Sequence, residues 1–188
     1  MTSVVVSEQR SWKTALGMML NPGLIVREAM GHVSWQYSLM VSGLAFTFFF
    51  LQTGLDLMRS GHSGVGQVIA LGAMGAIYGS LGVALIAQIA CLITKAFGNK
   101  HSVKWVISAF GLSYSSTLIY ALIGLLFSLF LQWNTSVAFG VSGVLWALGP
   151  MIATIKEMTG GRLWVSITCA TLCGGLLLFG WVILANSL

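Results

Sequence analysis

Residues Val65–Ile93 read VGQVIALGAMGAIYGSLGVALIAQIACLI, a run without a single charged side chain. An α-helix rises about 1.5 Å per residue, so about 20 apolar residues cross the roughly 30 Å of hydrocarbon in a bilayer. The run exceeds that minimum. It therefore predicts a transmembrane helix that is tilted or that begins outside the hydrocarbon.

The rest of the chain has the same character. Of its residues 57% are hydrophobic and only 7% are charged, whereas about a quarter of a soluble domain is charged. Four more runs are long enough to span a membrane: Tyr37–Leu57, Trp105–Gln132, Val137–Ile155 and Leu163–Ala185. The sequence predicts an all-α polytopic integral membrane protein with five transmembrane helices over residues 37–188, preceded by a cytoplasmic segment over residues 1–36.

The loops predict the orientation, because Lys and Arg accumulate on the cytoplasmic side of a membrane. Arg59 is alone on one side of the five predicted spans. The other side carries Arg10, Lys13, Arg27, Lys95, Lys100, Lys104, Lys156 and Arg162. We expect a multi-pass protein of the cell inner (plasma) membrane, with its N-terminus in the cytoplasm and its C-terminus outside.

The segment before the first span, NPGLIVREAMGHVSWQY over Asn21–Tyr37, predicts an amphipathic helix. Asn21 can cap a helix and Pro22 suits its first turn. Four apolar side chains then share one face: Val26, Ala29, Met30 and Val33. We expect this helix, and a second over Arg10–Leu20, to lie at the cytoplasmic membrane interface.

Small residues follow helical spacing in two spans. Helices in lipid associate where small side chains let their backbones approach closely. The second span carries Gly72, Gly75, Gly79 and Gly82, and the fourth repeats their spacing with Gly140, Gly143, Ala147 and Pro150. We expect these two seams to mediate close helix packing, so a leucine at Gly79 should disrupt folding or assembly.

The third span has a polar stripe made by Ser113, Thr117 and Tyr120. Hydroxyl groups at such positions commonly form hydrogen bonds between helices. The alternative interpretation is a polar groove that conducts a lipid or a solute.

Asp56 is the one ionisable residue near the interior of a predicted span. Arg59 follows three residues later and can pair with it along the helix. A boundary ion pair of this kind should tolerate Asp56→Asn, whereas an ion or proton site should not.

The sequence contains no pattern that requires an enzyme. GVSG at Gly140–Gly143 resembles the GxSG motif of rhomboid proteases, but a serine nucleophile needs a nearby base and no span contains a histidine. Cys169 and Cys173 lack the His or carboxylate partners of a metal site. We expect no catalytic residues, no metal and no cofactor.

Basic residues of the cytoplasmic face are the candidate contact residues. Each Lys or Arg near an anionic membrane surface contributes about 1 kcal/mol of attraction. A second copy would associate through the glycine seams. We assign contact with anionic lipids or with a protein partner to Arg27, Lys100, Lys104, Lys156 and Arg162. Short juxtamembrane loops do not favour nucleic-acid binding.

Three segments together resemble the Yip family of Ypt-interacting proteins, in particular its compact bacterial-type members. They are NPGLIVREAMGHVSW (Asn21–Trp35), AFGNKHSVKWVISAFGLSYSS (Ala96–Ser116) and IKEMTGGRLW (Ile155–Trp164). The resemblance implies five spans and a cytoplasmic N-terminus. Family members often carry a proline near Ser115–Thr117, where this chain has hydroxyl residues.

Eukaryotic members of this family bind small Rab-type GTPases and act in vesicle traffic, and their long cytoplasmic N-terminal region is absent from this sequence. The resemblance therefore implies an organising role more than a particular partner. We expect a non-enzymatic protein that organises the membrane or recruits lipid or protein partners through its basic cytoplasmic face. The alternative is a small transporter, channel or lipid scramblase that uses the polar stripe of the third span.

Overall fold

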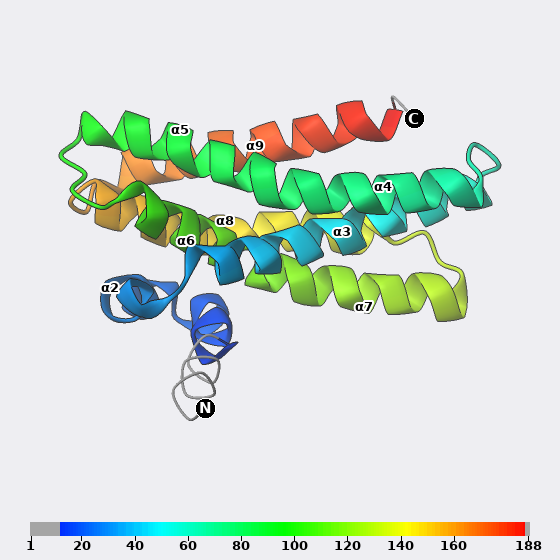
Figure 1. Ribbon diagram of the computed structural model, residues 1–188, viewed down its shortest axis with the longest axis horizontal. Helices are drawn as coiled ribbons and strands as arrows, with labels where there is room; N and C mark the ends of the chain where they lie inside the picture. The colour runs from blue at the N-terminus through cyan, green and yellow to red at the C-terminus, as the bar shows by residue number, and fades with distance from the viewer. Residues whose placement is uncertain (1–11, 187–188) are drawn as a thin grey trace.

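The structure is a computed structural model that describes residues 12–186, and the regular elements it assigns there are all helices. By length and composition, five helical rods can cross a membrane (Figure 1). They cover Trp35–Arg59, Val65–Lys95, Val103–Leu131, Ser136–Met158 and Leu163–Ala185. The predicted fold class, an all-α polytopic membrane protein with five spans, is confirmed.

Three of the five rods are not uniform α-helices. Span two contains a π-helical turn, span four begins with one, and span three is broken at Tyr114. The elements in order are α2 (Pro22–Glu28), η1 (Met30–His32), α3 (Trp35–Arg59), α4 (Val65–Ile77), η2 (Tyr78–Gly82), α5 (Val83–Lys95), α6 (Val103–Ser113), α7 (Ser115–Leu131), η3 (Ser136–Val141), α8 (Ser142–Met158) and α9 (Leu163–Asn186).

Helix α3 is the centre of the bundle. In its most apolar stretch 61% of the residues are buried, against 28% for α9. It packs against α4, α6 and α7. Its buried face carries three phenylalanines whose rings contact aromatic side chains of three other spans: Phe46, Phe49 and Phe50 against Tyr78, Tyr114 and Trp181.

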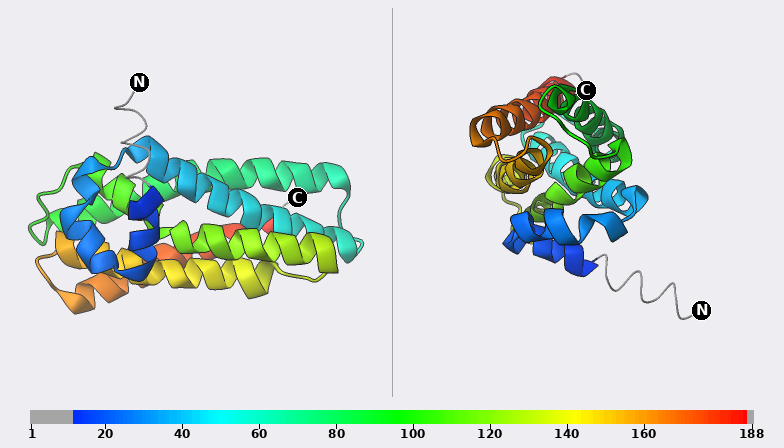
Figure 2. Two further views of the ribbon diagram at one scale, coloured as in Figure 1. Left: turned by 90° about the horizontal axis from the view of Figure 1, so that it is seen from below. Right: turned by 90° about the vertical axis from the view of Figure 1, so that its left-hand side faces the viewer.

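Two short helices, one over residues 12–20 and α2, cross the flank of the bundle (Figure 2). The Asn21 side chain caps α2 as predicted, accepting a hydrogen bond from the Leu24 N–H at 3.3 Å. Val26 and Met30 are buried in a cluster with Val41 of α3 and with Ala109 and Leu112 of α6, so this part of the predicted apolar face contacts the bundle. Other apolar side chains of these two helices are exposed: Trp12, Leu16, Leu20 and Leu24. Residues 1–11, including Arg10, and residues 187–188 lie outside the described part.

The bundle has two chemically different ends. One, which we call the basic end, holds α2 and the loops over residues 96–102 and 159–162 (Figure 1). The other, which we call the far end, holds the loops over residues 60–64 and 132–135. Loops that the sequence assigns to the same side of the membrane therefore lie together.

Candidate functional site

The five predicted contact residues lie in segments of the basic end. Helix α2 contributes Arg27 in its last turn, and the first turn of α6 contributes Lys104. The Ser102 side chain caps α6 by accepting a hydrogen bond from the Trp105 N–H at 3.3 Å. Lys156 belongs to the last turn of α8, and the two loops supply Lys100 and Arg162.

Two of these residues, Arg27 and Lys156, line a cavity of about 600 Å³ between α2 and α8, which we call the basic cavity. Glu157 also lines it, with its Oε2 3.2 Å from the Arg27 Nε. The Arg27 side chain is 69% exposed, so water and salt weaken this ion pair. The basic cavity has a net positive charge, because two cationic side chains and one anionic side chain line it.

Glycine keeps the basic cavity open. The other lining residues are Gly23, Gly149, Ile152, Ala153, Gly160, Gly161 and Leu163. A Cβ at Gly23 or Gly149 would meet no atom within 4 Å. Gly160 and Gly161 have φ of +62° and +91°, and the Gly161 N–H donates to the Lys156 carbonyl at 2.8 Å. This is the Schellman arrangement, which satisfies the end of α8 without a bulky side chain.

The other three basic residues do not line this cavity. Lys104 lines another cavity, of about 350 Å³, beside Trp35 and Trp105. The Arg162 guanidinium lies 5.4 Å from the Phe97 ring centroid, a cation–π contact that joins the two loops of the basic end. Lys100 is exposed in its loop.

The polar stripe of the third span does not form a continuous groove. Ser113 and Thr117 are buried, and their hydroxyls donate to the carbonyls of Ala109 at 2.9 Å and Gly143 at 2.8 Å. The Thr117 bond joins α7 to α8. Tyr120 is half-buried and lines a cavity of about 210 Å³ beside Trp146. Two of the three predicted groove residues are therefore closed within the bundle.

The glycine seam of span two contacts α3. A Cβ at Gly75 would be 2.5 Å from the Phe46 carbonyl oxygen, and one at Gly79 would overlap the Ser42 carbonyl oxygen. A Cβ at Gly72 would be 2.6 Å from the Leu51 side chain. The prediction that Gly82 shares this seam is wrong, since the three atoms nearest to a Cβ there all belong to Tyr78 of its own helix. The π-turn η2 adds a residue to the helical turn and rotates Gly82 away.

The small residues of span four pack against α3 and α7. A Cβ at Gly140 would overlap the Phe49 ring, and one at Gly143 would be 2.9 Å from the Thr117 Cα. Ala147 and Pro150 are also buried. The chain's own helices thus fill both seams, which leaves neither seam free to bind a second copy.

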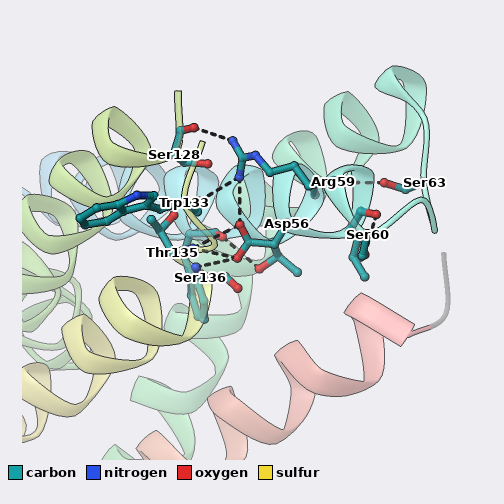
Figure 3. Close-up of polar contacts among 12 residues, drawn as sticks. Asp56, Arg59, Ser60, Ser63, Ser128, Trp133, Thr135 and Ser136 are labelled. Carbon is teal, nitrogen blue, oxygen red and sulfur yellow. Dashed lines mark hydrogen bonds and ion pairs between the residues drawn. The ribbon is translucent and has the colours of Figure 1, made fainter. Parts of the chain in front are cut away.

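At the far end, Asp56 joins the end of α3 to the start of span four (Figure 3). Its Oδ1 lies 3.3 Å from the Arg59 Nη1, so the predicted ion pair is present. Its Oδ2 also accepts hydrogen bonds from the backbone N–H groups of Thr135 at 3.0 Å and Ser136 at 2.9 Å. The carboxylate therefore caps η3, a role that the sequence analysis missed.

Arg59 extends this network to the third span. Its Nη1 donates to the Trp133 carbonyl at 2.9 Å, and its Nη2 donates to the Ser128 carbonyl in the last turn of α7 (Figure 3). One ion pair therefore fixes the ends of three spans. Most partners in this network are backbone groups, which a sequence does not reveal. Asp56, as an acidic residue within a predicted span, was the feature of the sequence that pointed to it.

No group of three His, Cys, Asp or Glu side chains within residues 12–186 is placed to bind a metal ion. Comparisons with family models, curated proteins and solved structures found no match to this chain. The residues of the basic end are therefore the basis for inferring a function.

Proposed function

We propose that this protein organises its membrane from the basic end, where it binds anionic lipid headgroups and recruits a protein partner without catalysing a reaction. The observation that carries the proposal is the collection of Arg27, Lys100, Lys104, Lys156 and Arg162 in segments of one end of the bundle. Their combined positive charge suits an anionic membrane surface. The resemblance to the Yip family suggests the same kind of role.

The proposal includes an orientation. The basic end faces the cytoplasm across the inner membrane, the N-terminus is cytoplasmic and the C-terminus is outside. The bias of Lys and Arg toward the loops of one end supports it, because cytoplasmic loops retain positive charge during insertion. A transport role has less support, since Ser113 and Thr117 are buried and hydrogen-bonded within the bundle.

Lipid enrichment in nanodiscs tests the proposal. Wild-type protein and a variant with all five basic residues changed to Gln are reconstituted with equal amounts of phosphatidylglycerol and phosphatidylcholine. Lipids that remain with the protein after mild detergent extraction are then quantified. We expect phosphatidylglycerol enrichment around the wild type, a large reduction in the variant, and weakening at about 1 M salt, where the Debye length is about 3 Å. Equal enrichment around both proteins would refute the proposal.

A further inference from the structure

We propose that a single anionic phospholipid binds lengthwise between the N-terminal helices and α8, with its phosphate in the basic cavity and an acyl chain extending toward Tyr120 and Trp146. This inference rests on the proposed function in one respect, namely that the basic end lies at the headgroup level. It adds a defined site and a stoichiometry.

Two cavities follow the same side of α8. The basic cavity includes Gly149, Ala153 and Lys156, and the deeper cavity of about 210 Å³ includes Trp146. Positions 146, 149, 153 and 156 are spaced three, four and three residues apart, which places them on one helix face. The chain segment opposite α8 is also shared, because Leu20 lines the deeper cavity and Gly23 the basic cavity. We call the two cavities together the α8 groove.

The length of the α8 groove matches one leaflet. Ten residues separate Trp146 from Lys156 along the chain, and at about 1.5 Å per residue they extend about 15 Å. That distance is half of the roughly 30 Å of hydrocarbon in a bilayer. A lipid whose phosphate lies beside Lys156 can therefore lay its acyl chain along α8 down to Trp146.

The α8 groove is charged at one end and mostly apolar at the other, as a phospholipid is from its headgroup to its acyl chains. Of the two cavities, only the basic cavity is lined by charged side chains. Arg27 and Lys156 carry two positive charges there and Glu157 one negative charge, so the net charge is +1. The deeper cavity is lined by Met19, Leu20, Ser116, Tyr120, Trp146 and Pro150. Trp146 is 62% exposed and its ring stacks near that of Tyr120 with centroids 6.3 Å apart, which gives an acyl chain a flat aromatic surface to contact.

The volume also suits a headgroup. Sites for small ligands commonly enclose about 300–1,000 Å³, and the basic cavity has about 600 Å³. Its two charged wall residues on α8 should act in opposite directions. Lys156 attracts the phosphate, whereas Glu157 repels it and also holds the Arg27 guanidinium.

Native mass spectrometry of the full-length protein with added phosphatidylglycerol tests the site. The wild type should retain one lipid. Gly149→Leu should reduce retention at least tenfold, because the new side chain fills space that no protein atom occupies. Gly175→Leu on α9 is the matched control, since a Cβ at Gly175 also meets nothing within 4 Å, and it should retain the lipid.

Charge variants test the phosphate position without filling the cavity. Removing one cation near the phosphate should weaken retention about fivefold, so Lys156→Gln should lower it and Glu157→Gln should raise it. Both side chains lie at the surface of the helix end, so their opposite effects remain measurable if Gly149→Leu does not fold. Size-exclusion profiles check folding of each variant.

Several results would overturn the inference: equal retention by Gly149→Leu, equal retention of phosphatidylcholine, or lower retention by Glu157→Gln. Displacement by an equal concentration of free glycerophosphate would instead indicate a site for soluble anions. If nanodiscs still show phosphatidylglycerol enrichment while no single lipid is retained, the proposed function stands and the α8 groove is not its lipid site.

Discussion

At the far end, two neighbouring side chains act on two different helix ends. The Asp56 carboxylate lies at the N-terminus of span four, where the helix dipole is positive. The Arg59 guanidinium binds a carbonyl in the last turn of α7, where the dipole is negative. Each charge therefore faces the helix terminus that stabilises it.

These contacts change the expectation for Asp56→Asn. An amide retains one acceptor oxygen but places an NH₂ group where the carboxylate meets backbone N–H donors, and it leaves Arg59 without its counter-ion. We expect a loss of about 2–3 kcal/mol in the free energy of unfolding, because hydrogen bonds to charged groups each contribute about 1.5–3 kcal/mol. Thermal unfolding in detergent measures it, with the exposed Glu28→Gln as control. An unchanged melting temperature for Asp56→Asn would contradict the capping role.

Thr117 provides a second test of a single contact. Thr117→Val keeps the shape of the side chain but removes the hydrogen bond to the Gly143 carbonyl between α7 and α8. Interhelical hydrogen bonds in membranes contribute about 0.6–2 kcal/mol, so we expect a loss of about 1 kcal/mol in denaturant titration. Ser113→Ala is the control. The Ser113 hydroxyl donates to a carbonyl of its own helix, so this substitution should lower the free energy of unfolding less than Thr117→Val does.

The sequence revealed local partners at this scale and missed distant ones. The spacing of three residues between Asp56 and Arg59 predicts their ion pair, which the structure contains. Thr135 and Ser136 were not foreseen as partners of Asp56, because they follow it by 79 and 80 residues and donate through backbone groups.

Among the elements, the π-turn η2 decides which glycines contact α3. Hydropathy and regular 3.6-residue spacing predicted span two and its seam, and Gly72, Gly75 and Gly79 indeed lie against α3. The extra residue of a π-turn has no signature in apolar composition, so the position of Gly82 was not predictable. The same turn directs Tyr78 toward α9, where its hydroxyl donates to the Leu177 carbonyl at 2.8 Å.

Matched alanine substitutions test this change of register. Gly79→Ala should destabilise the fold by about 1–3 kcal/mol, the usual cost of overpacking, because its Cβ would overlap the backbone of α3. Gly82→Ala should be neutral or slightly stabilising, since its Cβ has ordinary room and alanine favours a helix over glycine by about 1 kcal/mol. Equal losses of thermal stability in the two variants would show that span two continues as a regular α-helix.

The hydropathy of span three also did not predict the break in its helix. Tyr114 has φ −86° and ψ 10°, which interrupts the rod between α6 and α7 without a proline. The Ser115 hydroxyl donates to the Leu112 carbonyl at 2.7 Å, so a side chain satisfies a backbone group beside the break. Local side-chain bonds of this kind compete with regular helix geometry.

For the molecule as a whole, solvation explains what the sequence could predict. Apolar length predicts the five spans, because backbone groups in hydrocarbon must be paired within a helix. The central position of α3 was not predicted, since lipid and protein interiors are equally apolar and hydropathy does not distinguish them. For the same reason, the apolar side chains Val26 and Met30 were assigned to the membrane interface although they are buried in a cluster with residues of α3 and α6.

Cysteine labelling in sealed vesicles tests the arrangement of the two ends. Single substitutions Lys100→Cys and Lys156→Cys should react with an impermeant maleimide from one side, and His62→Cys from the other. The native thiols of Cys91, Cys169 and Cys173 are buried and should give little background. If Lys100→Cys and Lys156→Cys were modified from opposite sides, the five-span topology would be wrong and the basic residues would not lie on one side of the membrane.

The network around Asp56 also has a consequence for biosynthesis. The backbone donor of Thr135 is added to the chain 79 residues after Asp56. At about 5–20 residues per second, the ribosome needs roughly 4–16 s to supply it. The carbonyl of Ser128, which Arg59 binds, follows Arg59 by 69 residues, so both charges of the nascent first span wait for partners in later spans. Until then the two side chains have only each other and water as partners, so we expect the far end of the first span to stay at the bilayer boundary while the later spans are made.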